Sequence, residues 1–256
     1  MRLQVFLSHS GACSRRQALD LVKQGCVIVN EQMVCEPSFE VNPEKDRVFL
    51  EGLPIEIKRY EYLILNKPQE VTTTKKDRFA KTTVMDLLPK EFQHLYPVGR
   101  LDKESQGLLL LTNNGKLANS LMHPKFEVEK VYAVEVKGRL KENDKVRLQQ
   151  GIILEGGPAR TTEHNKTGIR SGGRTSKCQI NHVRFSPDKT SFEITVHEGR
   201  KRQIRLMLQS LGYLVLCLKR IKEGPISLGD LPEGKWRRLN EAEVESLKSL
   251  LNGKKV

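Results

Sequence analysis

Asp102 is the residue best placed to do chemistry in this chain. It lies a few residues before four consecutive leucines at 108–111, and the segment Asn113-Asn114-Gly115 follows them. Glycine before the leucines and Asn-Asn-Gly after them predict a short buried strand with a tight turn at each end. Asp102 would then lie in a loop at the mouth of the strand, fixed in place but open to a substrate. A carboxylate there could act as a nucleophile or proton acceptor, or it could merely cap a turn.

The residues around Asp102 resemble a known family motif, and this resemblance distinguishes between these roles. Gly-Arg-Leu-Asp at 99–102, followed by Gly-Leu-Leu-Leu-Leu-Thr-Asn at 107–113, resembles the signature loop of the pseudouridine synthases. The similarity is greatest to the branch that contains the ribosomal small-subunit synthase A and the large-subunit synthases B, E and F. It implies that Asp102 is the catalytic aspartate.

Two further motifs match that family in order along the chain. Lys130-Val131-Tyr132 is similar to a motif whose tyrosine lies against the target base, although the residues alone favour a core aromatic, because Tyr132 shares one strand face with Val134 and Val136. Residues 198–205 resemble the third motif, whose last arginine pairs with the catalytic aspartate. The resemblance therefore implies catalytic roles for Tyr132 and Arg205. Relatives often have Asn and Arg where this chain has Lys201 and Leu206, which leaves details of the substrate open.

The third motif is also unusually basic. We predict a helix after Gly199, with Arg200, Lys201 and Arg202 in its first turn and Arg205 close behind. Cations at a helix N-terminus oppose the macrodipole by roughly 0.3 to 1 kcal/mol each, so an anion is expected nearby. We assign RNA binding to Lys201 and Arg202 of this motif and to Arg100 of the first motif.

Residues 156–184 form a second basic segment. It carries six basic residues against Glu163 and is rich in glycine, which predicts a mobile hairpin that follows a phosphate backbone. Arg160, Arg170 and Arg174 are its candidate contacts. A solvated loop without contacts is an equal alternative for the tip.

The first fifty residues predict a separate RNA-binding module. Ser14 and Gln17 form a capping box for a helix that ends at Gly25, and two short strands follow. Cys-Ser-Arg-Arg at 13–16 and the later Gly-x-Val-x-Val-Asn resemble the S4 RNA-binding domain. The basic residues of the helix would face phosphates, although a solvated helix face is the alternative; they are Arg15, Arg16 and Lys23.

The whole chain of 256 residues carries 44 Lys and Arg against 31 Asp and Glu, a formal net charge of +13 that favours a polyanionic partner. We expect that partner to be ribosomal RNA, with no membrane. No apolar run reaches 18 residues and no signal-peptide core begins the chain, so we expect a cytoplasmic protein. We also expect a monomer. The five cysteines form no Cys-x-x-Cys pair and the histidines are dispersed, so we predict neither a metal site nor a disulfide framework. Nucleotide-binding fingerprints are lacking, and we expect no cofactor.

We therefore expect an α+β protein with four parts. They are an S4 domain at 1–50, a linker at 51–60, a catalytic domain at 61–251 built on a central mixed, mostly antiparallel sheet flanked by helices and loops, and a disordered tail at 252–256. The leading functional hypothesis is uridine isomerisation in ribosomal RNA, most simply of the large subunit. Small-subunit RNA and tRNA are alternative substrates. A non-catalytic RNA-binding assembly factor and a glycosidase are alternatives of other classes, and the glycosidase is disfavoured because the motif supplies only one well-matched carboxylate, with Glu104 nearby.

Overall fold

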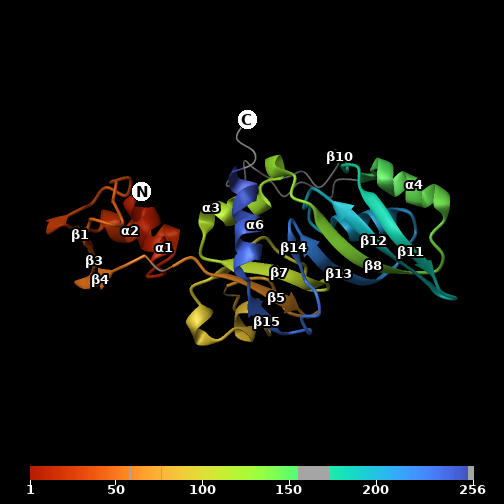
Figure 1. The fold of residues 1–256 in the computed structure, drawn as a ribbon, viewed down its shortest axis with the longest axis horizontal. Coiled ribbons are helices and arrows are strands. Elements are labelled where there is room, and N and C mark those ends of the chain that lie inside the picture. The colour runs from red at the N-terminus through yellow and green to blue at the C-terminus, as the bar shows by residue number, and fades with distance from the viewer. Residues whose placement is uncertain (58, 76, 155–172, 253–256) are drawn as a thin grey trace. The chain divides into compact units, whose positions relative to one another are not determined.

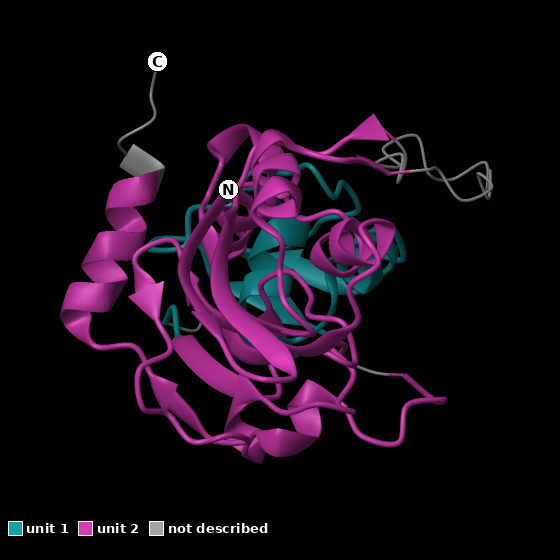
Figure 2. Cartoon of the chain, turned by 90° about the vertical axis from the view of Figure 1, so that its right-hand side faces the viewer, with its two compact units in different colours: residues 1–61 teal, residues 62–256 magenta. Residues whose placement is uncertain are grey.

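The computed structural model describes residues 1–57, 59–75, 77–154 and 173–252, and the chain divides into two compact units (Figure 2). Unit 1 is Met1–Glu61 and unit 2 is Tyr62–Val256. Each unit has its own buried apolar core, as expected of separately folded domains.

Unit 1 packs two helices on a small sheet. The helices are α1 (Leu3–His9) and α2 (Arg15–Lys23), and the sheet has the order β2-β1-β3-β4, formed by Gln32–Met33, Val27–Val29, Val48–Leu50 and Leu53–Ile55. The predicted capping box is present, because Ser14 and Gln17 satisfy each other's backbone N–H groups at the start of α2. The two predicted short strands are β1 and β2, and the turn between them places Asn30 and Glu31 both at positive φ.

The segment expected to be a linker, residues 51–60, is partly structured. Strand β4 lies within it and pairs antiparallel with β3, with Phe49 opposite Pro54. Gly52 has a positive φ and turns the chain between the two strands. Gly and Pro here therefore mark a hairpin rather than a linker, and unit 1 extends to Glu61.

Unit 2 is built on a mixed, mostly antiparallel nine-stranded sheet (Figure 1), as predicted. Its main path is β11-β12-β8-β13-β7-β5-β15, with β14 added to β13 and β6 added to β7. The strands of this path are Gln179–Phe185, Lys189–Val196, Lys130–Lys137, Val215–Glu223, Gln106–Thr112, Tyr62–Lys67 and Trp236–Arg238; β14 is Ile226–Ser227 and β6 is Tyr96–Pro97. The pairing of β13 with β7 is parallel and the other pairings are antiparallel.

Strands β5 and β7 are covered on both faces. The leucine run is the buried strand β7, as predicted, and its alternate residues enter two different cores. Leu108 and Leu110 pack on the side of α3 (Gly115–Met122) and α6 (Glu241–Asn252), whereas Leu109 and Leu111 pack with the 3-10 turns η1 (Val84–Leu87) and η2 (Lys90–Phe92). This double cover makes β7 a rigid support for the loop that enters it.

The remaining elements complete the other half of the sheet. Helices α4 (Glu142–Gln150) and α5 (Gln203–Ser210) supply residues to a third core beneath β8, β12 and β11. The short strands β9 (Ile153–Leu154) and β10 (Gly173–Arg174) pair with each other, and the turn η3 (Pro124–Phe126) follows α3. Residues 155–172 lie outside the described part, so Arg160 and Arg170 cannot be placed.

Two boundaries differ from the predictions. Helix α5 begins at Gln203, so Arg200 and Lys201 precede it instead of occupying its first turn. Arg202 is the N-cap, with a positive φ of 55°, and this bend re-aims the chain before the helix starts. Asn252, expected to begin a disordered tail, ends α6, and residues 253–256 lie outside the described part.

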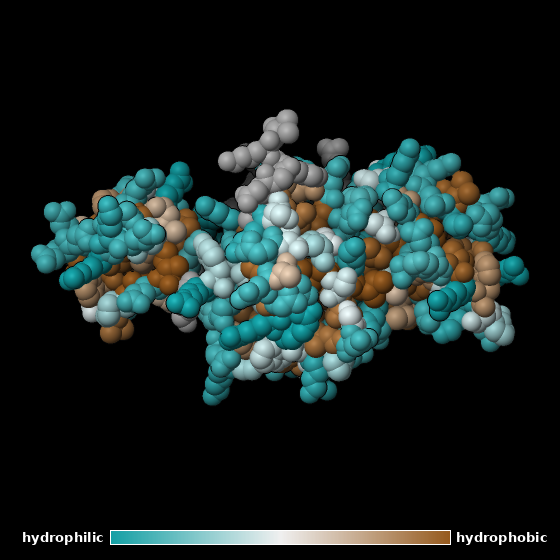
Figure 3. All heavy atoms as spheres, in the orientation of Figure 1, coloured by the Kyte–Doolittle hydropathy of each residue, from teal (hydrophilic) through white to brown (hydrophobic). Residues whose placement is uncertain are grey.

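No helix within the described ranges is long and apolar enough to cross a membrane. On the face shown in Figure 3, hydrophilic side chains lie among hydrophobic ones on both units.

Strands β7 and β13 approach each other closely at Gly107, and a substitution there tests this contact. Its φ is +104°, and a Cβ atom placed there would lie 2.3 Å from the carbonyl oxygen of Arg220. Gly138 has a similar φ of +80° but nothing within 4 Å of such an atom. We expect Gly107→Ala to lower the free energy of unfolding by about 2 kcal/mol more than Gly138→Ala does, measured by urea denaturation. Equal losses would show that the close approach is not a constraint.

Candidate active site

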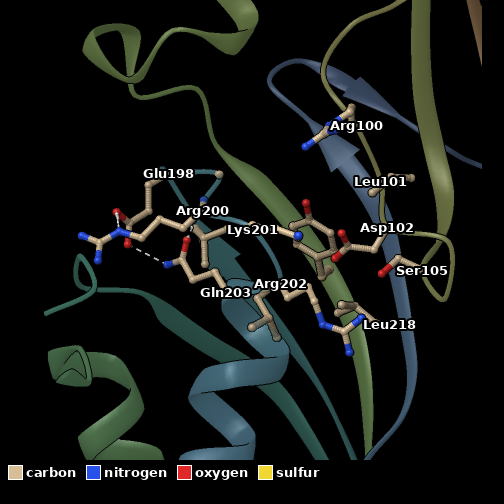
Figure 4. A pocket seen from close by; sticks show the side chains of 14 residues that line it. Arg100, Leu101, Asp102, Ser105, Glu198, Arg200, Lys201, Arg202, Gln203 and Leu218 are labelled. Atoms are coloured by element: carbon tan, nitrogen blue, oxygen red, sulfur yellow. Dashed lines mark hydrogen bonds and ion pairs between the residues drawn. The ribbon is translucent and has the colours of Figure 1, made fainter. Parts of the chain in front are cut away.

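A pocket opens where the Asp102 loop faces the chain before α5 (Figure 4). Asp102, Ser105, Lys201 and Arg202 contribute to its wall from the two sides, and Tyr132 of β8 also lines it. Arg100 is exposed at its rim. The structure thus brings together Asp102, Tyr132 and the predicted basic residues from segments far apart in the sequence.

The backbone of the Asp102 loop is held by hydrogen bonds to consecutive carbonyl groups. Thr73 Oγ1 donates to the carbonyl of Leu101 at 2.8 Å. The backbone N–H of Ser105 donates to the carbonyl of Asp102 at 2.9 Å, which closes a turn over residues 102–105. The N–H of Glu70 donates to the carbonyl of Lys103 at 2.9 Å. The Asp102 side chain itself is left half-buried and facing the pocket.

The next two carbonyls of the loop are bound by charged side chains. Arg205 Nη2 donates to the carbonyl of Glu104 at 3.0 Å. Lys67 Nζ donates to the carbonyl of Ser105 at 2.8 Å and also to those of Pro68 and Lys103, at 2.9 and 3.4 Å. Every carbonyl from residue 101 to residue 105 therefore has a donor, and the loop is fixed to β5 and α5 as well as to β7.

Lys67 is a buried ammonium group beneath this loop. Its side chain is 0% exposed, and burial lowers its pKa from 10.5 to about 8, an effect that the negative charges of Asp102 and Glu70 partly offset. Its three hydrogen bonds to carbonyls compensate the lost hydration. Lys67 therefore joins the end of β5 to the Asp102 loop and adds a positive charge behind it.

The Glu104 carboxylate contacts two arginines, Arg202 at the N-cap of α5 and Arg205 within the helix. Arg202 Nη1 lies 3.0 Å from Glu104 Oε1, and Arg205 Nε lies 3.6 Å from Glu104 Oε2. The predicted pairing of Arg205 with Asp102 is therefore not present in the structure. Because the Glu104 carboxylate lies between Arg202 and Arg205 and the Glu104 carbonyl takes a further bond, Arg205 anchors the loop through Glu104. These contacts with Arg202 and Arg205 lower the pKa of Glu104.

Tyr132 is both a packed aromatic residue and part of the pocket wall. It packs against two apolar cores, one beneath β8 and one beneath β7, and it also lines the pocket beside Asp102. Burial raises its pKa, while Arg220 opposes the rise. A partly buried aromatic ring at a pocket wall can cover a planar ligand.

The chain before α5 is held in place by Glu198. Its carboxylate accepts hydrogen bonds from Arg200 at 2.9 Å and from the side chain of Gln203 at 2.6 Å, which are the dashed lines of Figure 4. It also accepts one from the backbone of Ser176 at 2.8 Å. Lys201, in contrast, is exposed and lines the pocket, so its charge is available to a ligand.

The other basic residues assigned to RNA lie away from this pocket. Arg174 is exposed on β10 and lines a second hollow with Arg147 and Gln150. In unit 1, Arg15, Arg16 and Lys23 are exposed on α2. Their side chains are thus accessible to a polyanion, and no more is established about their contacts.

Sequence reasoning gave no role to Lys67 or Arg220 and little weight to Glu104. The signal available for Lys67 was a lysine at the end of an otherwise buried strand, immediately before Pro68. The signal for Arg220 was a charged residue inside a strand that also carries apolar residues. Such residues are rarely buried without partners. Lys67 donates hydrogen bonds to three carbonyls, and Arg220 forms an ion pair with Glu223.

The described residues contain no group of three or more His, Cys, Asp or Glu side chains that could hold a metal ion. The chemistry available in the pocket is that of an open carboxylate on a fixed loop, faced by cations and an aromatic ring. A carboxylate so placed can act as a nucleophile or proton acceptor toward a polyanionic ligand.

Comparison with protein families gives two matches. Residues 61–210 match the RNA pseudouridylate synthase family, and residues 1–48 match the S4 domain. All the residues that line the pocket except Leu218 lie within the first match, and the exposed cations of α2 lie within the second.

Individual relatives agree. An RNA pseudouridine synthase of Aquifex aeolicus is 39% identical over 96% of this chain and 93% of its own. The ribosomal large subunit pseudouridine synthase B of Bacillus subtilis is 36% identical over 97% of this chain and 96% of its own. A crystal structure of a pseudouridylate synthase, 28% identical, aligns over 96% of this chain and 99% of its own, with a TM-score of 0.65.

Lys67 makes a testable contribution to stability against pH. The pKa of Lys67 is lower in the folded protein, so the unfolded chain binds more protons between about pH 8 and pH 10.5. As the pH rises, Lys67 loses its proton in the folded protein, and the free energy cost of burying a charged ammonium group is relieved. We compare the free energies of unfolding of the wild type and Lys67→Met. The wild-type value minus the variant value should increase by about 3 kcal/mol over the whole window. Urea denaturation at pH 7, 8, 9 and 10 measures it. A difference independent of pH would contradict the buried ammonium.

Proposed function

Because the chain belongs to the RNA pseudouridine synthases, which isomerise uridine to pseudouridine in RNA, we propose that its substrate is ribosomal RNA of the large subunit and that Asp102 is its catalytic residue. The single observation that carries the assignment of Asp102 is its half-buried carboxylate, which lines the pocket from a loop whose carbonyls are all bonded.

The reaction fits a site of this composition. Uracil is detached from its ribose, rotated and rejoined through carbon 5, so neither a redox carrier nor an external energy source takes part. Asp102 supplies the carboxylate that acts as nucleophile or proton acceptor in this sequence. The loop holds that carboxylate still, which reduces the entropy lost on reaching the reactive geometry.

Tyr132 is proposed to lie against the flipped base. Its ring lines the pocket beside Asp102, where it can cover the uracil while the glycosidic bond is open. Arg205 is a positioning residue in this proposal, since its bonds are to Glu104 in the same loop.

The basic residues hold the distorted RNA. A uridine must leave its stack to enter the pocket, which costs a few kcal/mol that contacts elsewhere must offset. Arg100, Lys201 and Arg202 surround the pocket and suit the phosphates next to the flipped nucleotide. Arg15, Arg16 and Lys23 of the S4 domain would bind phosphates further along the same RNA.

The choice of the large subunit rests on a relative. A synthase of Bacillus subtilis that aligns with nearly all of this chain is named for the large ribosomal subunit. The test is to incubate the protein with unmodified transcripts of large-subunit RNA, small-subunit RNA and tRNA and to map pseudouridine in each. Modification confined to the large-subunit transcript supports the proposal, and modification of another transcript alone overturns it.

Asp102→Asn should abolish pseudouridine formation, because the amide keeps the shape of the side chain but cannot act as a nucleophile or base. Glu70→Gln makes the same chemical change in an exposed residue outside the pocket and should retain most of the wild-type rate. Single-turnover rates of the two variants are compared after measurements show that their RNA affinity and their free energy of unfolding are equal. Comparable turnover by Asp102→Asn would remove Asp102 from the chemistry.

The double variant Arg16→Ala/Lys23→Ala should bind RNA more weakly and reduce the slope of log affinity against log salt by roughly one to two units. Lys45→Ala is the matched control, because Lys45 is also exposed in unit 1 but does not lie on α2. Equal slopes for wild type, double variant and control would show that α2 is not the phosphate-binding face.

A further inference from the structure

Glu198 holds both sides of the bend that carries Lys201. Its carboxylate accepts hydrogen bonds from Arg200 Nε at 2.9 Å and from Gln203 Nε2 at 2.6 Å, so it binds a residue on each side of Lys201 in the chain. The side chain of Gln203 also accepts a hydrogen bond from the backbone N–H of Arg200 at 3.3 Å. Residues 200–203 are therefore closed into one bend, with Lys201 inside it.

The bend is also fixed to a second part of the chain, at and after β10. The backbone N–H of Ser176 donates to Glu198 Oε1 at 2.8 Å, and Arg200 Nη2 donates to the carbonyl of Arg174 at 2.9 Å. The side chains of Arg200 and Glu198 are only 19% and 16% exposed, so solvent screens their ion pair less than it screens a surface pair. The bend therefore cannot move without breaking partly buried polar contacts.

Lys201 differs from the arginines around it. Each arginine at 200–205 forms an ion pair with Glu198 or Glu104. Lys201 forms no ion pair with another residue that the structure describes, and it is exposed and lines the pocket. Figure 4 shows its side chain pointing toward the side of the pocket that Asp102 occupies. The carboxylates thus hold the arginines, whereas the Lys201 ammonium group is left for an anion of the ligand.

We infer that Glu198 is a positioning residue for the reaction: by closing the bend at 200–203, it holds the Lys201 ammonium group where a phosphate next to the flipped nucleotide must lie. The inference rests on the proposed placement of a uridine beside Asp102. A carboxylate that lines such a pocket repels phosphate, so its charge alone is a disadvantage there. The geometry that Glu198 imposes on the bend accounts for its presence.

The effect of removing the Glu198 charge separates the two possible roles by its sign. If Glu198 acts on RNA only through its charge, Glu198→Gln removes a repulsion and strengthens binding. If Glu198 holds Lys201 in place, the same change displaces a cation and weakens binding. Each cation that leaves a phosphate makes the dependence of affinity on salt shallower by about one unit.

The first test is RNA affinity against salt, which needs no turnover. Binding of the large-subunit transcript is measured for the wild type, Glu198→Gln, Lys201→Met and the double variant. The slope of log affinity against log salt should become shallower by about one unit in Lys201→Met and by a similar amount in Glu198→Gln, with no further change in the double variant. An unchanged or steeper slope in Glu198→Gln would overturn the inference.

Glu243→Gln is the matched control. The Glu243 carboxylate accepts hydrogen bonds from Arg237 at 2.7 and 2.8 Å and from the backbone N–H of Asn240 at 2.9 Å, and its side chain is 19% exposed. It lies in α6 and does not line the pocket. Glu243→Gln should keep the wild-type slope. A change as large as that of Glu198→Gln would show a general loss of structure and would contradict the inference.

Arg200→Met opens the same bend from the other partner. It should make the salt slope shallower in the wild type and leave it unchanged in Lys201→Met, as Glu198→Gln does. It therefore decides the inference if Glu198→Gln fails to fold. A further loss of slope in Lys201→Met would show that Arg200 binds phosphate itself, and the bend would then not act through Lys201.

The second test is a double-mutant cycle on the single-turnover rate with the same transcript. Glu198→Gln should slow the wild type by about 100-fold, the scale expected when a group at the site is displaced by about 1 Å, but should cause no further loss in Lys201→Met. Equal losses in both backgrounds would make Glu198 merely structural. If the wild type does not modify this transcript, the proposed substrate is wrong, and the salt slopes still decide the role of Glu198.

Discussion

The hydrogen bonding of the carbonyls of residues 101–105 is the constraint on which the site depends. Their donors come from Thr73, Ser105, Glu70, Arg205 and Lys67, and so from four different parts of unit 2. Fixing the backbone of a residue costs about 1 to 2 kcal/mol of entropy, and a buried carbonyl left unpaired costs about 1 to 3 kcal/mol. Pairing each carbonyl therefore stabilises one loop conformation, in which the Asp102 carboxylate is left open.

The sheet supplies the support for this arrangement. The loop leads into strand β7, which is buried on both faces, and Lys67 at the end of β5 holds the loop from a second strand. The parallel approach of β13 at Gly107 brings Arg220 beneath the same site. Charged groups thus lie behind the pocket in hydrogen-bonded positions, while Lys201 and Arg100 remain exposed, as the proposed contacts with RNA require. The division fits catalysis of a reaction in which the protein must orient the base and hold the backbone.

The features of the fold that could be predicted from the sequence are those that depend on a local residue pattern or on the order of the motifs. The leucine strand and the capping box of α2 are present because each depends on residues close together in the chain. The mixed sheet pairs segments far apart in the chain, and it was expected from the family resemblance. The predicted partner of Arg205, Asp102, was wrong, because Arg205 contacts Glu104 instead. Which of the two carboxylates Arg205 reaches depends on the bend of the chain at Arg202, and no periodicity in the sequence reveals that bend. The ion pair of Arg220 with Glu223 depends on a bulge, and strand alternation predicts opposite faces for the two residues.

The carbonyl hydrogen bonds should keep the Asp102 loop ordered before RNA binds. Backbone ¹⁵N relaxation of residues 101–105 in the free protein measures this order directly on the picosecond-to-nanosecond timescale. We expect order parameters of about 0.85, equal to those of β7 and unchanged when RNA is added. Order parameters below about 0.6 in the free protein, rising on RNA binding, would contradict it, because the substrate rather than the carbonyl bonds would then be ordering the loop.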